Sequence, residues 1–183
     1  ERTAWHSACG NGKTETVELI FQSSKDFGID LNAKDISGRT AWHFACINGK
    51  TETAQLLIQL SKEFGIDRID LNAENNGGGT AWFEACWNGN SEIAQLIIQS
   101  SKEFGIHLNA KSNGGGTALH AACINGKTET VQMILKNWKE FGIDIKAQDN
   151  QGKTALDHIN PHQGGKWIQI KEMLKKEYSH FPD

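Results

Sequence analysis

The sequence lacks the features that would indicate a membrane protein, a flexible linker or a nucleic-acid-binding protein. Its 183 residues include only two prolines and no low-complexity tract, which leaves little room for disordered linkers. It has no apolar run of about eighteen residues that could span a membrane, and its first residues show no signal-peptide pattern. Its net charge is −3, with lysine and glutamate interleaved, whereas a nucleic-acid partner requires a concentrated basic face. We therefore expect a folded protein of about one domain that binds neither nucleic acid nor membrane.

Closely spaced cysteines are also missing. The four cysteines are Cys9, Cys46, Cys86 and Cys123, and each lies 37 or 40 residues from the next. That spacing lacks the short Cys-x-x-Cys pairs of a zinc site. On stacked helices about 8–10 Å apart, their Cα atoms would lie beyond the roughly 7 Å that a disulfide allows. We therefore expect four reduced, buried thiols in an intracellular, cytoplasmic protein.

Catalytic and cofactor-binding motifs are missing as well. The sequence contains no recognisable Ser-His-Asp set and no phosphate-binding loop. Its glycine triplets, 77–79 and 114–116, lack the lysine and the helix arrangement of a nucleotide site and are interpreted as turn glycines. We expect no enzyme activity, no metal and no cofactor.

What the sequence does contain is a repeat. Four similar stretches begin at Thr3, Thr40, Thr80 and Thr117, at spacings of 37, 40 and 37 residues, and a weaker fifth copy begins at Thr154, 37 residues later. Self-similarity at this period predicts one supersecondary unit stacked on itself, with a continuous core running from unit to unit. Such an array typically holds another macromolecule on an extended concave surface, so binding is the favoured function.

The second unit predicts a pair of helices. Thr40 is expected to be the N-cap of a short helix that ends at an Asn-Gly pair, and Thr51 is expected to cap a longer helix. Apolar residues at helical spacing continue that second helix to Phe64, where a glycine ends it, with Phe64 and Ile66 placed for a hydrophobic C-cap contact. An extended Leu-Asn-Ala segment and a polar, glycine-rich turn then lead to the next unit.

These residues resemble the ankyrin repeat. Its motif is matched in the second unit at Asp35, Gly38, Thr40, His43, Ala45 and Gly49. The resemblance covers almost the whole chain, although each full unit is longer than the family's usual length of about 33 residues. It implies an all-α solenoid of helix-turn-helix units with hairpin-like connecting loops. It also implies a single domain over 1–183, with units at about 1–36, 37–76, 77–113, 114–150 and 151–183, the last one serving as a C-terminal cap.

The resemblance assigns structural roles to recurring histidines and tryptophans. A histidine follows the threonine by three positions at His6, His43 and His120, and ankyrin proteins use this pair to hydrogen-bond the start of the inner helix. A tryptophan replaces the family's buried leucine at Trp5, Trp42 and Trp82. We expect the tryptophans to fill the core and each indole N–H to find a partner. The alternatives are a metal or catalytic role for the histidines, and a stacking platform for sugars or bases on the tryptophans.

The resemblance also implies where a partner binds. Ankyrin proteins usually bind other proteins on the concave face formed by the turn tips and the inner helices. The matching turn positions are Ile36, Ser37, Arg39, Asn76, Gly77, Gly79, Asn113, Gly114, Gly116, Asn150, Gln151 and Lys153. The matching inner-helix positions are Ser7, Gly10, Phe44, Ile47, Phe83, Glu84, Trp87, Ala121 and Ile124. We expect a protein-binding module whose partner is another protein.

The third unit differs most from its neighbours. It carries Phe83 in place of the histidine, then Glu84, and it carries Trp87 where the neighbouring units have Ile47 and Ile124. A large, rigid aromatic side chain beside a carboxylate is typical of a binding hot spot. The alternative is that Trp87 folds back over the seam between units and contributes only to packing.

The two ends of the array differ. The last unit has an expanded loop at 160–165 and a polar final helix, which is the composition that a terminal cap requires. The first unit keeps an apolar outer helix with no polar cap before it, so either the chain is part of a longer array or another copy covers this face by self-association. A structural spacer in a larger ankyrin scaffold and an engineered or recently duplicated repeat binder are the alternatives to a natural binding module.

Overall fold

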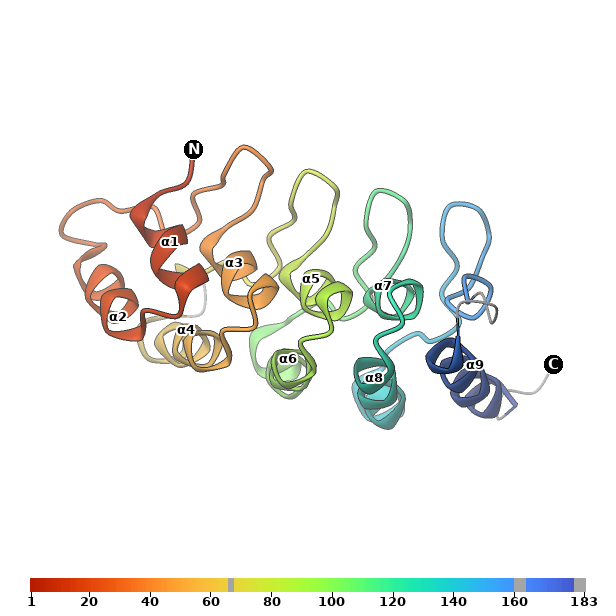
Figure 1. The fold of residues 1–183 in the computed structure, drawn as a ribbon. Helices are drawn as coiled ribbons and strands as arrows, with labels where there is room; N and C mark the ends of the chain where they lie inside the picture. Colours follow the sequence, from red (N-terminus) through yellow and green to blue (C-terminus); the bar gives the residue numbers. More distant parts are fainter. Residues whose placement is uncertain (66–67, 160–163, 180–183) are drawn as a thin grey trace.

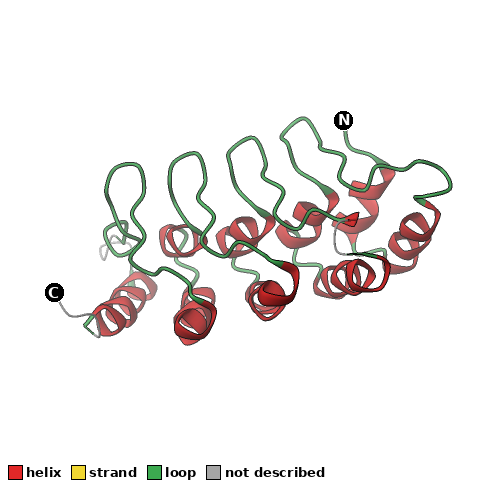
Figure 2. Ribbon diagram, turned by 180° about the vertical axis from the view of Figure 1, so that it is seen from behind, coloured by secondary structure: helices red, strands yellow, loops and turns green. Residues whose placement is uncertain are grey.

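The protein consists of two rows of helices with a set of hairpin loops along one side (Figure 1). The computed structural model describes residues 1–65, 68–159 and 164–179, and this part of the chain contains nine helices and no strand. The inner helices are α1 (Ala4–Asn11), α3 (Ala41–Ile47), α5 (Ala81–Asn88) and α7 (Ala118–Ile124). The outer helices are α2 (Thr14–Ser23), α4 (Thr51–Phe64), α6 (Ser91–Phe104), α8 (Thr128–Phe141) and α9 (Gly165–Tyr178). The hairpin loops project beyond the inner row (Figure 2), and the predicted all-α solenoid is confirmed.

Three of the four full units begin with a hydrogen-bonded pair of threonine and histidine. In the second unit the backbone N–H of Thr40 donates to His43 Nδ1 over 3.2 Å, which places the ring proton on Nε2. His43 Nε2 then donates to the carbonyl oxygen of Gly79 over 3.1 Å. His6 and His120 make the same two contacts in their units. The predicted pair is confirmed, and its histidine also ties each unit to the next hairpin.

The repeated tryptophans fill the core between units, as predicted, and all three are buried. The indole N–H of Trp82 donates to the carbonyl oxygen of Leu108 over 3.0 Å, and the tryptophan of the first unit makes the equivalent bond. The fourth unit has Leu119 at this position, and there the hydroxyl of Tyr178 on α9 donates to the equivalent carbonyl, that of Ile145. The terminal helix thus supplies the bond that a fourth tryptophan would have made.

The four cysteines are free and buried, as predicted. Burial raises the pKa of the Cys9 thiol to about 12 and raises the pKa of the other three thiols as well. A thiol that stays neutral is a poor nucleophile and a poor metal ligand. These side chains therefore act as small apolar core residues.

One predicted helix cap is wrong. Thr51 is the first residue of α4, and Lys50 occupies the cap position without a side-chain hydrogen bond. The hydroxyl of Thr51 donates to Glu92 on the next outer helix over 3.1 Å, so it links two units instead of closing its own helix. The predicted contact between Phe64 and Ile66 lies outside the described residues.

The first outer helix is shorter than its counterparts. α2 ends at Ser23 after 10 residues, whereas α4, α6 and α8 each have 14. The second unit, which is three residues longer than its neighbours, reaches into this region. Its Arg68 guanidinium lies 4.6 Å from the centroid of the Phe21 ring and donates to the hydroxyl of Ser24. Ile69 beside it is buried. The short helix and the insertion therefore fit one another across the unit boundary.

The described residues of the fifth unit contain no inner helix, although the repeat predicts one. Residues 155–158 form turns, and 160–163, which include most of the predicted loop, lie outside the described residues. The sequence reaches Pro161 soon after the unit begins, and a residue that precedes proline disfavours helical backbone. The outer helix α9 nevertheless caps the array, because Ile170 and Leu174 are buried while its last turn carries two lysines.

The hairpin tips are joined by an asparagine ladder formed by Asn76, Asn113 and Asn150. The backbone N–H of Asn113 donates to the carbonyl oxygen of Gly77 over 2.8 Å, and its side-chain amide donates to the carbonyl oxygen of Asn76 over 3.0 Å. Asn76 and Asn150 make equivalent contacts with the hairpins before them. Gly38 shows how close the approach is, because it adopts φ +76° and a Cβ there would collide with Asn76. The ladder holds the tips in a fixed row beside the inner helices.

Candidate functional site

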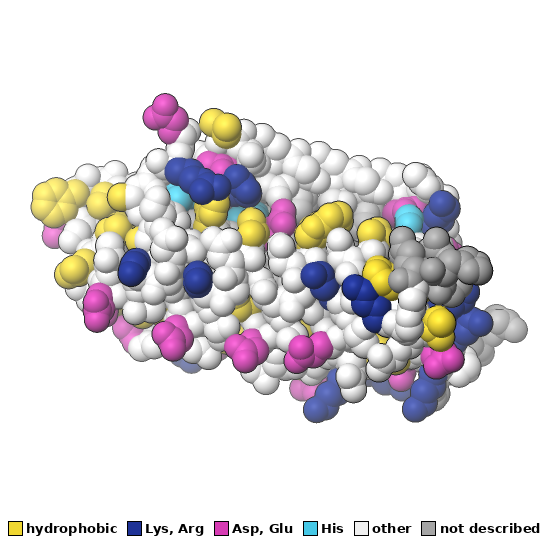
Figure 3. Space-filling view, in the orientation of Figure 1, with side chains coloured by type: hydrophobic (Ala, Val, Ile, Leu, Met, Phe, Trp, Pro, Cys, Tyr) yellow, Lys and Arg dark blue, Asp and Glu magenta, His cyan; other side chains and the backbone are white. Residues whose placement is uncertain are grey.

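An aromatic pair lies on the surface of α5. The rings of Phe83 and Trp87 are stacked, with centroids 6.1 Å apart and planes inclined by 24°. Trp87 is 42% exposed, so the alternative in which it folds back into the seam is wrong. Ile124, at the equivalent position on α7, is 41% exposed, and Ile47 on α3 is half-buried. Hydrophobic side chains gather around α5 and α7 in Figure 3. We call Ile47, Phe83, Trp87 and Ile124 the central patch.

The outward position of Phe83 follows from the residue that it replaces. His43 and His120 reach the next hairpin because each has a ring N–H that donates to a carbonyl oxygen. Phenylalanine has no such donor, and Phe83 lies half-buried against Trp87 instead. The carbonyl oxygen that a histidine would have reached, that of Gly116, accepts only the backbone N–H of Ser112 from the described residues.

Glu84 lies beside the central patch on the same helix. Its Oε1 atom accepts a hydrogen bond from the side-chain amide of Asn75 over 2.7 Å. Asn75 is itself fixed, because its Oδ1 atom accepts the backbone N–H groups of Gly77 and Gly79 over 2.8 and 3.0 Å. Burial raises the pKa of the half-buried Glu84 carboxyl. The hairpin thus holds this carboxylate in place without neutralising it.

A basic cluster lies over α1 and α3 (Figure 3). Arg39 donates to Asp35 Oδ2 through Nη2 over 2.8 Å and through Nε over 3.1 Å. Burial alone would raise the pKa of Asp35, but hydrogen bonds from Arg39 and Ser37 hold it at about 2. The guanidinium groups of Arg2 and Arg39 also lie over the ring of Phe44, 4.3 and 4.8 Å from its centroid.

The predicted binding residues are not equally accessible. Exposed side chains belong to Ser7, Ile36, Asn76, Trp87, Asn113, Ile124, Asn150, Gln151 and Lys153. Half-buried ones belong to Ser37, Arg39, Ile47, Phe83 and Glu84, while Gly77 and Gly114 are exposed and Gly116 is half-buried.

Four predicted contact residues are buried, and the expectation that they face a partner is wrong. Phe44 lies beneath two arginines, and Ala121 is covered almost completely. Gly79 is buried, and its carbonyl oxygen is occupied by a histidine. A Cβ at Gly10 would lie only 3.2 Å from the Asn48 side chain. The motif alone does not show that these four positions are buried.

Two residues of this surface escaped the prediction. The side-chain amide of Asn75 donates a hydrogen bond to Glu84. The sequence marked this residue only by having Asn75 at the position where the previous hairpin has Asp35. Arg2 lies over Phe44 from a different unit, and its sequence signal was its position directly before Thr3, equivalent to that of Arg39 before Thr40.

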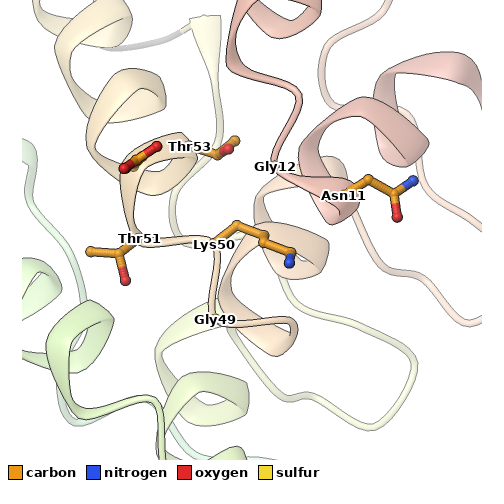
Figure 4. Close-up of a pocket in the computed structure, with 7 residues that line it drawn as sticks. Asn11, Gly12, Gly49, Lys50, Thr51 and Thr53 are labelled. Carbon is orange, nitrogen blue, oxygen red and sulfur yellow. The ribbon is translucent and has the colours of Figure 1, made fainter.

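A polar cavity of about 310 Å³ lies away from this surface, between the first and second units (Figure 4). Asn11 and Gly12 lie on one side of it and residues 49–53 on the other. Thr53, which also lines it, is buried, and its hydroxyl has no hydrogen-bond partner in the described part of the chain. Across the described residues no group of three His, Cys, Asp or Glu side chains could hold a metal ion, and no helix is long and apolar enough to cross a membrane.

The free face of the first unit is apolar. Ala4 and Ile20 are accessible, whereas the equivalent Ala41 and Leu57 of the second unit are fully buried by the first. Ala4, Trp5, Ile20 and Ile29 contribute to an open cavity of about 340 Å³. The face therefore has the composition of an interface between units but is not covered by one.

The stacked helix pairs, the threonine–histidine contacts and the row of hairpins define a helical repeat protein. A family model described as ankyrin repeats in three copies matches residues 5–112, and one described as ankyrin repeats in many copies matches residues 103–159. No curated protein matches the sequence. The chain belongs to the ankyrin repeat family, whose repeats generally act as protein–protein interaction modules.

Proposed function

We propose that this chain binds a partner protein on the concave face formed by the inner helices and hairpin tips, and that it catalyses no reaction. The central patch carries this proposal, because an exposed tryptophan stacked on a phenylalanine supplies a large, rigid contact area. The asparagine ladder and the short inner helices preform the surface, so little entropy is lost on association. The proposed contact residues are Ile36, Ser37, Arg39, Ile47, Asn76, Phe83, Glu84, Trp87, Asn113 and Ile124. The four free, buried thiols support an intracellular location.

Selection of randomly displayed 12-residue peptides on the immobilised chain tests this proposal. We expect enriched peptides whose affinity falls at least about tenfold in Trp87→Ala, the loss that a hot-spot aromatic produces. Phe27→Ala is the matched control, because Phe27 is exposed but lies on the outer side of the first unit. Enriched peptides that bind the Trp87→Ala variant as tightly as the wild type would move the site elsewhere. Failure to enrich any peptide would favour the spacer alternative.

The free face of the first unit supports a second proposal, association with another copy of the chain. Its accessible Ala4 and Ile20 correspond to residues that are fully buried between units, and apolar faces of this kind are usually covered. We expect the weight-average mass in sedimentation equilibrium to rise with concentration, and Ile20→Lys to abolish the rise. A wild-type mass that stays at 20.2 kDa across the concentration range would refute this proposal.

A further inference from the structure

The surface around Phe83 presents two hydrogen-bond acceptors that the chain itself leaves incompletely satisfied. Within the described residues, only Asn75 donates to the Glu84 carboxylate, and only Ser112 donates to the Gly116 carbonyl oxygen. The corresponding carbonyl oxygens of Arg39, Gly79 and Lys153 each receive a second hydrogen bond from a histidine. The exchange of histidine for Phe83 thus removes a donor from this part of the surface.

The charge of Glu84 is not neutralised by a neighbour. Ion pairs between described residues join Arg39 to Asp35, Lys62 to Glu103 and His158 to Asp149, and none of these three includes Glu84. The charge of Arg39 lowers the pKa of Glu84, but its guanidinium is already held by two hydrogen bonds to Asp35. A half-buried carboxylate without a cation has lost part of its hydration with no ion pair to compensate.

The surroundings of Glu84 favour a cation over other ligands. The Phe83 and Trp87 rings lie on the same helix, and aromatic faces attract a cationic side chain. A partner carboxylate would be repelled by Glu84, and a metal ion would need further ligands that the described residues do not provide. The hairpins on either side carry exposed glycine at 77 and 114 and half-buried glycine at 116, which leaves room at these positions for a partner backbone.

We propose that the third unit binds an arginine or lysine side chain of the partner, with its cationic group on the Glu84 carboxylate and its stem against the Phe83–Trp87 pair. This inference rests on the proposed function and adds the chemistry of the partner. The Gly116 carbonyl oxygen is available to accept a further hydrogen bond from the bound segment. Guanidinium–carboxylate and ammonium–carboxylate contacts are the strong class of hydrogen bond, so this contact also fixes the register of the bound segment.

The peptide selection described above tests this inference through a charge reversal. We expect the enriched peptides to share a basic residue, and Glu84→Gln and Glu84→Lys to bind them about tenfold and about a hundredfold more weakly. Replacing the shared basic residue by glutamate should restore binding to Glu84→Lys. The control variant is Glu140→Lys, which makes the same charge change on an exposed residue at the end of α8. Circular dichroism establishes that all variants fold alike.

The outcomes separate the two proposals. Enriched peptides that depend on Trp87 but share no basic residue, or that bind Glu84→Lys as tightly as the wild type, overturn the basic side-chain inference and leave the protein-binding function standing. If no peptide is enriched, both proposals fall together. Restoration of binding by the reversed pair supports the assignment of the cation to Glu84, because a general loss of structure would not be rescued by a peptide of opposite charge.

Discussion

Replacing Trp82 by alanine is expected to lower the free energy of unfolding by about 3–5 kcal/mol, the usual cost of deleting a large buried aromatic side chain. The Trp82 side chain is only 1% exposed and belongs to the hydrophobic core. Its loss leaves a cavity in the middle of the array and removes the donor to the Leu108 carbonyl oxygen. Urea unfolding followed by circular dichroism measures the effect.

Two further variants make the test of Trp82 specific. Trp87→Ala deletes the same side chain from an exposed position and is expected to change stability by less than about 1 kcal/mol. Trp82→Leu reproduces the fourth unit, which has Leu119 at this position. It should lower the free energy of unfolding by less than Trp82→Ala but by more than Trp87→Ala. The remaining loss is expected because no tyrosine donates to the Leu108 carbonyl oxygen as Tyr178 donates to that of Ile145. Equal effects of alanine at positions 82 and 87 would contradict the assignment of Trp82 to the core.

Lowering the pH from 7 to 4.5 is expected to destabilise the protein by about 2–3 kcal/mol through His43 alone. Burial lowers the pKa of His43 from its ordinary value of 6.5 to about 4. Between these values the unfolded chain binds a proton that the folded chain does not, so stability is complete above pH 6.5 and falls as the pH drops toward 4. Burial lowers the pKa of His120 as well, which adds to the loss in the same direction.

The dependence of stability on pH is measured from the midpoints of urea unfolding at pH 7 and at pH 4.5. His43→Phe is the matched variant, because the third unit already carries Phe83 at this position. The variant is less stable at pH 7, since it leaves the Gly79 carbonyl oxygen without its histidine donor, but its stability should fall less on acidification. An identical fall in the wild type and the variant would show that His43 is not the titrating group.

Much of the fold could be predicted because repeated residues make the same local contact in the units that carry them. The pairing of threonine with His43 and the burial of Trp82 are of this kind, and both are confirmed. The failures concern contacts between units. Thr51 was predicted as a cap because the pattern of its own helix suggests one, whereas its hydroxyl reaches Glu92 on the next helix.

The candidate surface could be predicted only in part, for the same reason. Aligning the units shows that Trp87 differs from the isoleucines at the same position, and its exposure agrees with the predicted place on the inner helices. Alignment places Arg2 and Arg39 at the same position, directly before the repeated threonine, but it cannot show that both guanidinium groups lie over Phe44. The link from Asn75 to Glu84 was also missed, since it depends on how the hairpin folds back over α5.

The fit between Arg68 and the shortened helix α2 means that the units are not interchangeable parts. The outer helix of the first unit ends early, and the extra residues of the second unit lie against it, so these two departures from the repeat meet at one boundary. We expect a chain in which the second unit follows a 14-residue outer helix to lose the contacts of Arg68 with Phe21 and Ser24. The first two units are therefore matched to each other by contacts that the other boundaries do not repeat.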